Sequence, residues 1–141
     1  KGYSIDVSPL PLRSATNLHD AKVALTPFSD RLRLAGTMEF AGVDEKINQR
    51  RVDAILRAPR TYLRNWVPPV ELSPAQAGMR PMTPDGLPAI GSIPGLSNAY
   101  VSTGHGMLGV TLAAGSALAL ADLVMYGTRR PVLAPFDPAR F

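Results

Sequence analysis

The most regular hydrophobic pattern in the chain is an alternation over residues 31–40, RLRLAGTMEF. Apolar or small residues take the even positions, and two arginines and a glutamate are among the odd ones. A period of two predicts an antiparallel strand with one buried face. Residues 21–28, AKVALTPF, form a second predicted strand, and a turn at residues 29–30 joins the two into a hairpin. Residues 2–7, GYSIDV, predict a further strand.

Two longer segments have the character of helices. The first is an amphipathic helix over residues 45–57, with Asp44 as its N-cap residue and Pro59 ending it. Its predicted apolar side consists of Ile47, Ala54, Ile55 and Leu56. The second helix covers residues 106–126, GMLGVTLAAGSALALADLVMY, and Gly127 is its predicted C-cap residue.

The second helix is apolar on every side, which is typical of a helix buried in a larger protein. Its length would suit a membrane span, but Ser116, Asp122 and its alanine-rich faces favour packing against protein. Because a domain of 141 residues can hardly surround such a helix, we expect the chain to be cut from a longer protein. In isolation it would expose an apolar surface over residues 107–126 and self-associate. The last ten residues, 132–141, are predicted to be extended.

Composition narrows the class of protein. The chain is 45% apolar and 18% charged, which suits a folded domain, and its 14 prolines and 12 glycines argue against a helical bundle. The predicted fold class is α+β: an antiparallel or mixed sheet with one amphipathic helix and one long buried C-terminal helix. The net charge of +4 comes without a basic run interleaved with aromatic residues, so nucleic acid is not an expected partner. There is no cysteine, and the two histidines lack metal-ligand spacing, so no metal is expected.

One candidate binding element is the stretch GMRPMTPDGLPAIG, in which a single arginine, Arg80, stands among rigid residues. TPDG, residues 83–86, predicts a β-turn, and the prolines on both sides remove backbone freedom. A guanidinium held in advance can bind a carboxylate through two parallel hydrogen bonds at a lower ordering cost. The common alternative for a lone arginine is a surface ion pair.

A second candidate element is STGHGMLG, where a predicted strand over residues 99–104 runs into the second helix. Glycines allow a ligand to approach the backbone closely, and the free N–H groups at the start of a helix favour negative charge. Gly104, His105 and Gly106 form the turn, and Met107, Leu108 and Gly109 follow it. The alternative is a tight turn without a ligand. His105 itself could be a base or only a turn residue, and the lack of a carboxylate at a useful distance favours the latter.

These segments resemble, in order, the C-terminal part of the FAD-dependent D-amino acid dehydrogenase and oxidase family. The resemblance covers nearly the whole chain and is carried by KGYSIDV, RLRLAGTMEFAG, AGMRPMTPDGLPAIG and NAYVSTGHGMLGVTLAAGSALALADLV. Bacterial D-amino acid dehydrogenases look nearer than glycine oxidases. The resemblance implies a two-domain enzyme whose nucleotide-binding GxGxxG motif lies in an N-terminal region. That motif is absent from these residues, so the resemblance implies a C-terminal fragment that would not hold FAD firmly alone.

The resemblance also implies roles for particular residues. Arg80 would pair with the substrate carboxylate, and Tyr3 and His105 would lie on the substrate side. Backbone N–H groups of the turn would face the pyrimidine edge of the flavin. The implied cofactor-binding residues are Gly104, His105, Gly106, Met107, Leu108, Gly109 and Thr111. Residues 1–98 would form the substrate-domain sheet and the carboxylate-binding loop, and residues 99–141 would form the flavin-facing part.

The implied reaction is oxidative deamination, with the α-hydrogen leaving as hydride. Covalent attachment of the flavin through cysteine cannot occur within this segment. One departure affects the substrate: close relatives carry Trp where this chain has Gln76, which leaves the preferred amino acid open. Three alternatives therefore stand: a D-amino acid enzyme, a glycine, sarcosine or hydroxyproline-type amine oxidase or dehydrogenase, and a binding module without catalysis. The electron acceptor is also open, and the expected location is cytoplasmic, with or without association with the inner face of the membrane.

Overall fold

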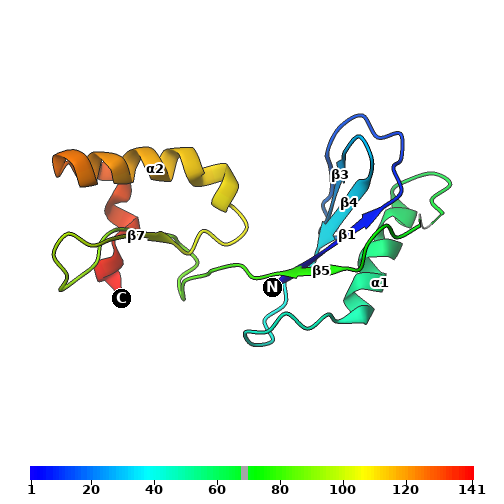
Figure 1. Ribbon diagram of the computed structural model, residues 1–141, viewed down its shortest axis with the longest axis horizontal. Helices are drawn as coiled ribbons and strands as arrows, with labels where there is room; N and C mark the ends of the chain where they lie inside the picture. Colours follow the sequence, from blue (N-terminus) through cyan, green and yellow to red (C-terminus); the bar gives the residue numbers. More distant parts are fainter. Residues whose placement is uncertain (68–69) are drawn as a thin grey trace. The chain divides into compact units, whose positions relative to one another are not determined.

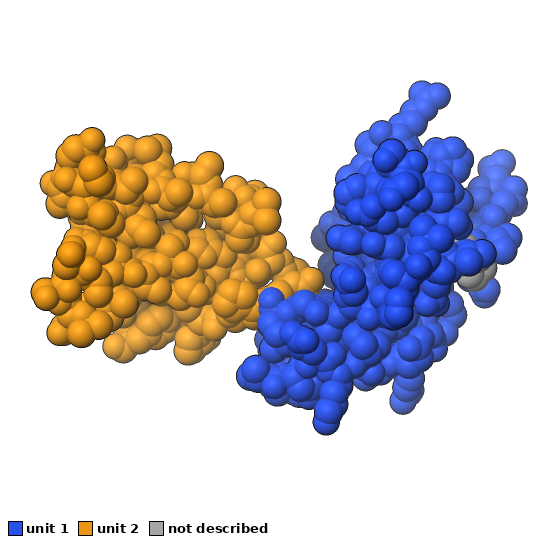
Figure 2. Space-filling model, viewed as in Figure 1, with its two compact units in different colours: residues 1–79 blue, residues 80–141 orange. Residues whose placement is uncertain are grey.

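The computed structural model describes residues 1–67 and 70–141 and divides the chain into two compact units, 1–79 and 80–141 (Figures 1 and 2). The sequence placed the boundary after residue 98, whereas the structure places it after residue 79. The reason is a strand pair, because β6 (Ala89–Ser92) hydrogen-bonds to β7 (Tyr100–Thr103) and therefore joins the second unit.

The first unit is built on a five-stranded antiparallel sheet with the order β2-β3-β4-β1-β5. Its strands are β1 (Gly2–Val7), β2 (Thr16–Leu18), β3 (Val23–Pro27), β4 (Leu32–Gly36) and β5 (Gln76–Gly78). The predicted hairpin is confirmed, since β3 and β4 pair from Val23↔Gly36 to Pro27↔Leu32. β1 then pairs with β4 on the other side, so the first and fourth strands lie at the centre of the sheet.

The predicted strand over residues 31–40 is shorter in the structure, because its alternation is interrupted after Gly36. Thr37 adopts φ +72°, a left-handed conformation that strands do not use. Leu32 and Leu34 are buried as predicted, but Phe40 is 79% exposed. The buried face of β4 therefore extends over only the first half of the pattern.

The amphipathic helix is present as α1 (Gln49–Arg57), four residues shorter at its start than predicted. Asp44 does not cap it, because the Asp44 carboxylate accepts hydrogen bonds from the Lys46 N–H at 2.9 Å and from the Lys1 ammonium at 2.6 Å. The predicted apolar side is partly wrong: Ile47 lies before the helix and is 40% exposed. Val52 and Ile55 are the residues that α1 buries, and they join the core formed by the inner face of the sheet.

The second unit contains the β6–β7 hairpin, α2 (Gly109–Tyr126) and two 3₁₀ helices, η2 (Pro131–Phe136) and η3 (Pro138–Arg140). Its small core joins Ile90 of β6, Ala119 of α2 and Leu133 of η2. Gly127 ends α2 in the left-handed conformation, φ +65°, as predicted. The prediction of an extended tail is wrong, because prolines at the first turns of both 3₁₀ helices favour helical dihedrals there.

The helix α2 has the length and hydropathy of a membrane span. Of its eighteen residues, all of them described, only Ala119 is buried in this chain. Val110 is 95% exposed and Met125 70% exposed, which agrees with the predicted apolar surface. A soluble core helix and a membrane span satisfy the same length and hydropathy test, so α2 by itself does not indicate a membrane protein.

Candidate functional site

The loop that follows Arg80 is rigid for reasons that the structure makes explicit. The predicted turn is confirmed, since the Gly86 N–H donates to the Thr83 carbonyl at 3.1 Å. The Thr83 hydroxyl donates to the Leu87 carbonyl at 2.6 Å, and the Leu87 N–H donates to the Asp85 carboxylate at 3.0 Å. Three hydrogen bonds within five residues leave this loop little freedom, and the Asp85 carboxylate takes part in one of them.

The structure brings together two segments: residues 80–88, called the arginine loop, and residues 104–109, called the glycine-rich turn. The Gly106 N–H donates to the Pro81 carbonyl at 3.0 Å, and Met82 forms a β-bridge with His105. The residue directly after Arg80 is thereby bonded to the turn that precedes α2. Arg80 is half-buried at the start of this unit. The two motifs are separated along the sequence, and no local signal in either one indicates that they pair.

Two glycines of the turn meet different requirements. Gly104 has φ +77°, and a Cβ there would lie 2.6 Å from the Thr83 methyl group, so no larger residue fits without a shift. Gly106 has φ +55°, but a Cβ there would meet only the Met82 Cγ, at 3.9 Å. Gly104 is therefore needed for packing against the arginine loop, whereas at Gly106 a Cβ would make only an ordinary contact with Met82 and the left-handed backbone is the feature that favours glycine.

The start of α2 is suited to an electron-rich or anionic group. The first helical hydrogen bond runs from the Leu112 N–H to the Leu108 carbonyl at 2.8 Å, so the N–H groups of Gly109, Val110 and Thr111 have no acceptor within the helix. Leu108 supplies no side-chain cap, and the first turn, all of it described, contains no acidic residue. Met107 and Leu108 are 66% and 53% exposed. These features fit the electron-rich edge of a reduced flavin.

His105 is held by α2. Its Nε2 lies 3.0 Å from the Ser116 hydroxyl, and the two share a hydrogen bond. The ring is half-buried, and the His105 Cβ would be 3.7 Å from a Cβ at Gly109. This contact orients the imidazole within the turn. Ser116 was missed by the sequence analysis, since its place two helical turns into α2 carries no signal for such a bond.

Tyr3 lies in the first unit, and the structure places it in the core. Its side chain is 2% exposed, and its hydroxyl donates to the Glu39 carboxylate at 2.5 Å. The Arg51 guanidinium lies 3.2 Å from the same oxygen. Burial raises the pKa of the Tyr3 phenol, and the bond to Glu39 raises it further. This environment favours a packing role, and a role towards the substrate remains a prediction.

Each unit also contains a cavity. In the second unit a cavity of about 470 Å³ lies between α2, β6 and η2, where Thr111 and Ser116 meet apolar side chains and Arg130. Thr111, a predicted cofactor residue, therefore lines a cavity formed by its own unit. Arg130 is paired with Asp122 of α2. Neither Arg130 nor the 3₁₀ segment after it was expected to line a cavity, because the tail was predicted to be extended.

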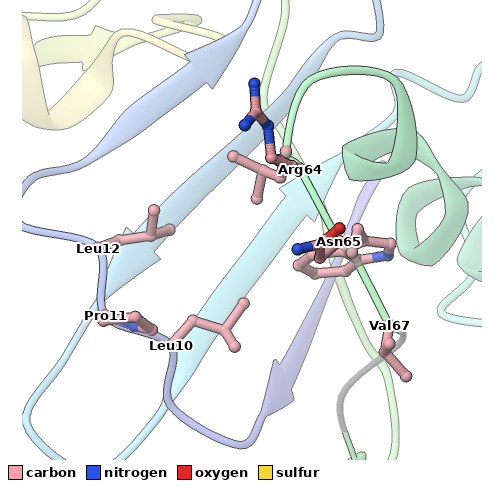
Figure 3. A pocket seen from close by; sticks show the side chains of 8 residues that line it. Leu10, Pro11, Leu12, Arg64, Asn65 and Val67 are labelled. Atoms are coloured by element: carbon pink, nitrogen blue, oxygen red, sulfur yellow. The ribbon is translucent and has the colours of Figure 1, made fainter.

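The cavity of the first unit measures about 300 Å³ and lies between Leu10–Leu12 and Leu63–Val67 (Figure 3). Trp66 lines it and donates its indole N–H to the Leu56 carbonyl at 3.1 Å. Trp66 is thus part of the wall of this cavity. Gln76 is exposed on β5.

Comparisons with known proteins identify the family. Residues 1–123 match the family described as FAD dependent oxidoreductase. The chain is 43% identical over 133 residues to a D-amino acid dehydrogenase from Vibrio cholerae serotype O1, covering 90% of this chain and 31% of that protein. It is 42% identical over 133 residues to a D-amino acid dehydrogenase from Vibrio vulnificus, covering 88% and 30%. The chain thus spans about a third of the length of these curated relatives.

Solved structures share its fold. Glycine oxidase from Geobacillus kaustophilus superposes with a TM-score of 0.76 at 27% identity, covering 99% of this chain and 38% of that one. Iminodiacetate oxidase from a Chelativorans species superposes with a TM-score of 0.78 at 19% identity, covering 97% and 38%, which shows the fold alone. Because the family match extends over most of the chain and agrees with its fold and its paired motifs, this chain belongs to the family of FAD-dependent oxidoreductases.

Proposed function

We propose that this chain supplies the substrate-binding and flavin-facing residues of an enzyme that oxidatively deaminates D-amino acids. The observation that carries the proposal is the hydrogen bond from Gly106 to the Pro81 carbonyl, at 3.0 Å, which joins the arginine loop to the turn before α2. Arg80, the proposed carboxylate-binding residue, then lies next in sequence to a residue that is bonded to the turn, and the turn is the proposed site for the electron-rich flavin ring. The similarity to D-amino acid dehydrogenases supports this choice of substrate class.

In this proposal Arg80 binds the substrate carboxylate. The loop after it is fixed by its own turn and by its bonds to the glycine-rich turn, so the guanidinium is held in advance. Holding the substrate by its carboxylate leaves the α-carbon and the amine free to be oriented towards the oxidant. The side-chain pocket is the part that Gln76 would alter, so the preferred amino acid is to be found by measurement.

The turn and the first residues of α2 would hold FAD. When bound, FAD supplies the oxidising power by accepting the α-hydrogen as hydride. The chain contributes the N–H groups of Gly109, Val110 and Thr111. They form the positive end of the helix dipole, which would stabilise negative charge on a ring bound beside it. His105, oriented by Ser116, lies in the same turn and completes the candidate set.

This chain would hold only part of the FAD molecule. Because the relatives are about three times as long, the adenine and pyrophosphate of FAD would be bound mainly by residues that the chain lacks. The exposed apolar face of α2 would then pack against that region. We place the intact enzyme in the cytoplasm, with or without contact with the membrane, and we leave the electron acceptor to be measured.

A second candidate is an amine oxidase or dehydrogenase for glycine, sarcosine or a cyclic imino acid. The observation that favours it is the 27% identity and shared fold with a glycine oxidase. Small amines need little space for a side chain. A binding module without redox chemistry is the third possibility that an experiment should separate.

The test is anaerobic reduction of the flavin in the gene product that contains this chain. A panel of D- and L-amino acids, glycine, sarcosine and hydroxyproline isomers is added, and flavin absorbance is recorded. Bleaching by D-amino acids that is lost in Arg80→Ala but kept in Arg13→Ala, an exposed arginine of the first unit, supports the proposal. Bleaching only by the small or cyclic amines moves the protein to the second candidate. A preparation that binds no flavin contradicts both.

A further inference from the structure

The C-terminal tail is built to contact the arginine loop. It folds as η2 and η3, and the Asp137 side chain caps η3 by accepting the Ala139 N–H at 2.9 Å. η3 packs on the hairpin, since a Cβ at Gly91 of β6 would lie 3.0 Å from the Pro138 ring. In Figure 1 the red tail passes along the hairpin that carries β7 and ends close to it. This contact was not expected from the sequence.

Arg140, next to the last residue, holds the turn of the loop at three points. Its Nε lies 2.6 Å from one Asp85 oxygen and its Nη2 lies 3.1 Å from the other, which is a bidentate ion pair. Nη2 also donates to the Leu87 carbonyl at 2.7 Å. On the tail side, Nη1 donates to the Asp137 carbonyl at 3.0 Å, and the guanidinium lies 4.3 Å from the centre of the Phe141 ring.

The loop is thus anchored at both ends. At its start, Pro81 and Met82 are bonded to the glycine-rich turn, and at its end Asp85 and Leu87 are bonded to Arg140. We propose that Arg140 is a positioning residue for substrate binding: through Asp85 and Leu87 it fixes the loop that presents Arg80. The inference rests on the proposed function, because it assumes that Arg80 binds the carboxylate.

The chemistry of the contact favours positioning over simple charge pairing. An isolated surface ion pair contributes little to stability, but this guanidinium uses donors on all three of its nitrogens in fixed directions. Only 18% of the Arg140 side chain is exposed. The bond from Arg140 is also the largest cause that lowers the pKa of Asp85 below its ordinary value, as expected for a charge-assisted hydrogen bond. Lysine could supply the charge but not the planar, three-point geometry.

Loss of this anchor should weaken substrate binding more than it slows the chemical step. The loop would keep its internal turn but could move relative to the hairpin, so ordering it would reduce the affinity for the carboxylate. We expect KM for the D-amino acid to rise about tenfold in Arg140→Met, with kcat changed much less, because small displacements of positioning groups have large effects. Arg140→Lys should recover little of the loss.

The experiment uses the flavin-loaded gene product that contains this chain and measures KM and kcat for Arg140→Met, Arg140→Lys, Asp85→Asn and Arg80→Ala. Arg129→Met is the matched control, because Arg129 is an arginine of the same tail that pairs with Asp137 and, among the described residues, makes no bond to the loop. Amide hydrogen exchange at Leu87 gives a second readout that does not depend on activity, and it should become faster in Arg140→Met and not in Arg129→Met.

The outcomes are distinguishable. A raised KM and faster exchange in Arg140→Met, with Arg129→Met unchanged, support the positioning role. An unchanged KM in Arg140→Met, while KM rises in Arg80→Ala, overturns the inference and leaves the proposed function intact. Unchanged KM in both variants overturns both, because Arg80 would not bind substrate. If Arg140→Met does not fold, an unchanged KM and unchanged exchange in the milder Asp85→Asn overturn the inference.

Discussion

The backbone of Gly104 lies directly against the side chain of Thr83, at a distance that excludes any larger residue: a Cβ at Gly104 would be 2.6 Å from the Thr83 methyl group. Gly104 also has φ +77°, a conformation that residues with a Cβ avoid. This contact joins the glycine-rich turn to the arginine loop in addition to the backbone bond from Gly106 to Pro81. It makes the junction between the two motifs testable by single substitutions.

We predict that Gly104→Ala destabilises the second unit by about 1–3 kcal/mol, because it adds a clash and backbone strain together. Urea unfolding followed by the helical circular dichroism signal measures this, since most of the α-helix is in α2. Adding Thr83→Ser removes the clashing methyl but keeps the hydroxyl bond to Leu87, so it should restore part of the loss. Gly115→Ala is the control: among the described residues, a Cβ at Gly115 would meet nothing within 4 Å outside its own stretch of helix, so the substitution should be neutral or stabilising. Equal stability of Gly104→Ala and wild type would contradict the contact.

The ion pair of Asp6 and Arg33 should stabilise the first unit only while Asp6 is charged. The Arg33 guanidinium bonds both Asp6 oxygens, at 2.7 and 2.8 Å, and this lowers the pKa of the carboxyl below its ordinary 3.8. The stabilisation is therefore present above pH 3.8 and is lost as the pH falls through the lower value in the folded state.

We expect Asp6→Asn to cost about 1 kcal/mol at neutral pH and progressively less in acid. Fluorescence of Trp66, the single tryptophan, follows unfolding of the first unit. Asp30→Asn, which removes an exposed carboxylate paired with the neighbouring Arg31, should have almost no effect. A deficit in Asp6→Asn that does not shrink at low pH would show that charge is not the cause.

Tyr3→Phe separates the two roles considered for this residue. If Tyr3 is a core residue, loss of its bond to Glu39 should lower the Tm of the first unit by a few degrees and leave KM unchanged. The measurements are thermal unfolding of the chain and substrate kinetics of the gene product that contains it. A raised KM at unchanged Tm would instead support the predicted place of Tyr3 on the substrate side.

The exposed face of α2 should cause the chain to self-associate, because apolar residues such as Val110, 95% exposed, and Met125, 70% exposed, lie on it. Light scattering should give a mass that rises with concentration, and the double substitution Val110→Lys and Met125→Lys should bring it towards that of a monomer. Val43→Lys, at a 94% exposed position of the first unit, is the control. A monodisperse wild-type monomer would refute the expectation.

Binding of FAD to the 141 residues alone should be weaker than micromolar, because they would contact the ring and not the adenine or pyrophosphate. Titration followed by flavin fluorescence measures the affinity. Riboflavin should then bind about as well as FAD, since the nucleotide adds little. Micromolar or tighter binding of FAD, with riboflavin clearly weaker, would mean that the chain contains a nucleotide site of its own.

Much of the local structure could be predicted because it depends on neighbouring residues. The alternation over residues 31–40 placed a strand and its buried leucines, and TPDG placed a turn closed by the bond from Gly86 to Thr83. Gly127 marked the end of α2 because the helix ends there in the left-handed backbone conformation, which glycine adopts readily. In each case the decisive interactions span a few residues, so the pattern carries them.

The features that could not be predicted have a common cause: they depend on contacts between residues far apart in the sequence. Asp44 looked like an N-cap, but the Lys1 ammonium, 43 residues away, bonds its carboxylate, and α1 begins later. The compact units divide after residue 79 because β6 pairs with β7, and this pairing could not be seen in either segment.

What the sequence determined by itself was the class of fold and the two motifs, since periodicity and turn residues carry this information. The family was implied only by the resemblance of its segments to those of a known family, which the family match then confirmed. What only the tertiary structure decided was how the motifs work together: the Gly106 N–H bonded to the Pro81 carbonyl and the Arg140 guanidinium bonded to Asp85, 55 residues away. A hydrogen bond requires two groups at a given distance and angle, and that geometry depends on the whole path of the chain between them.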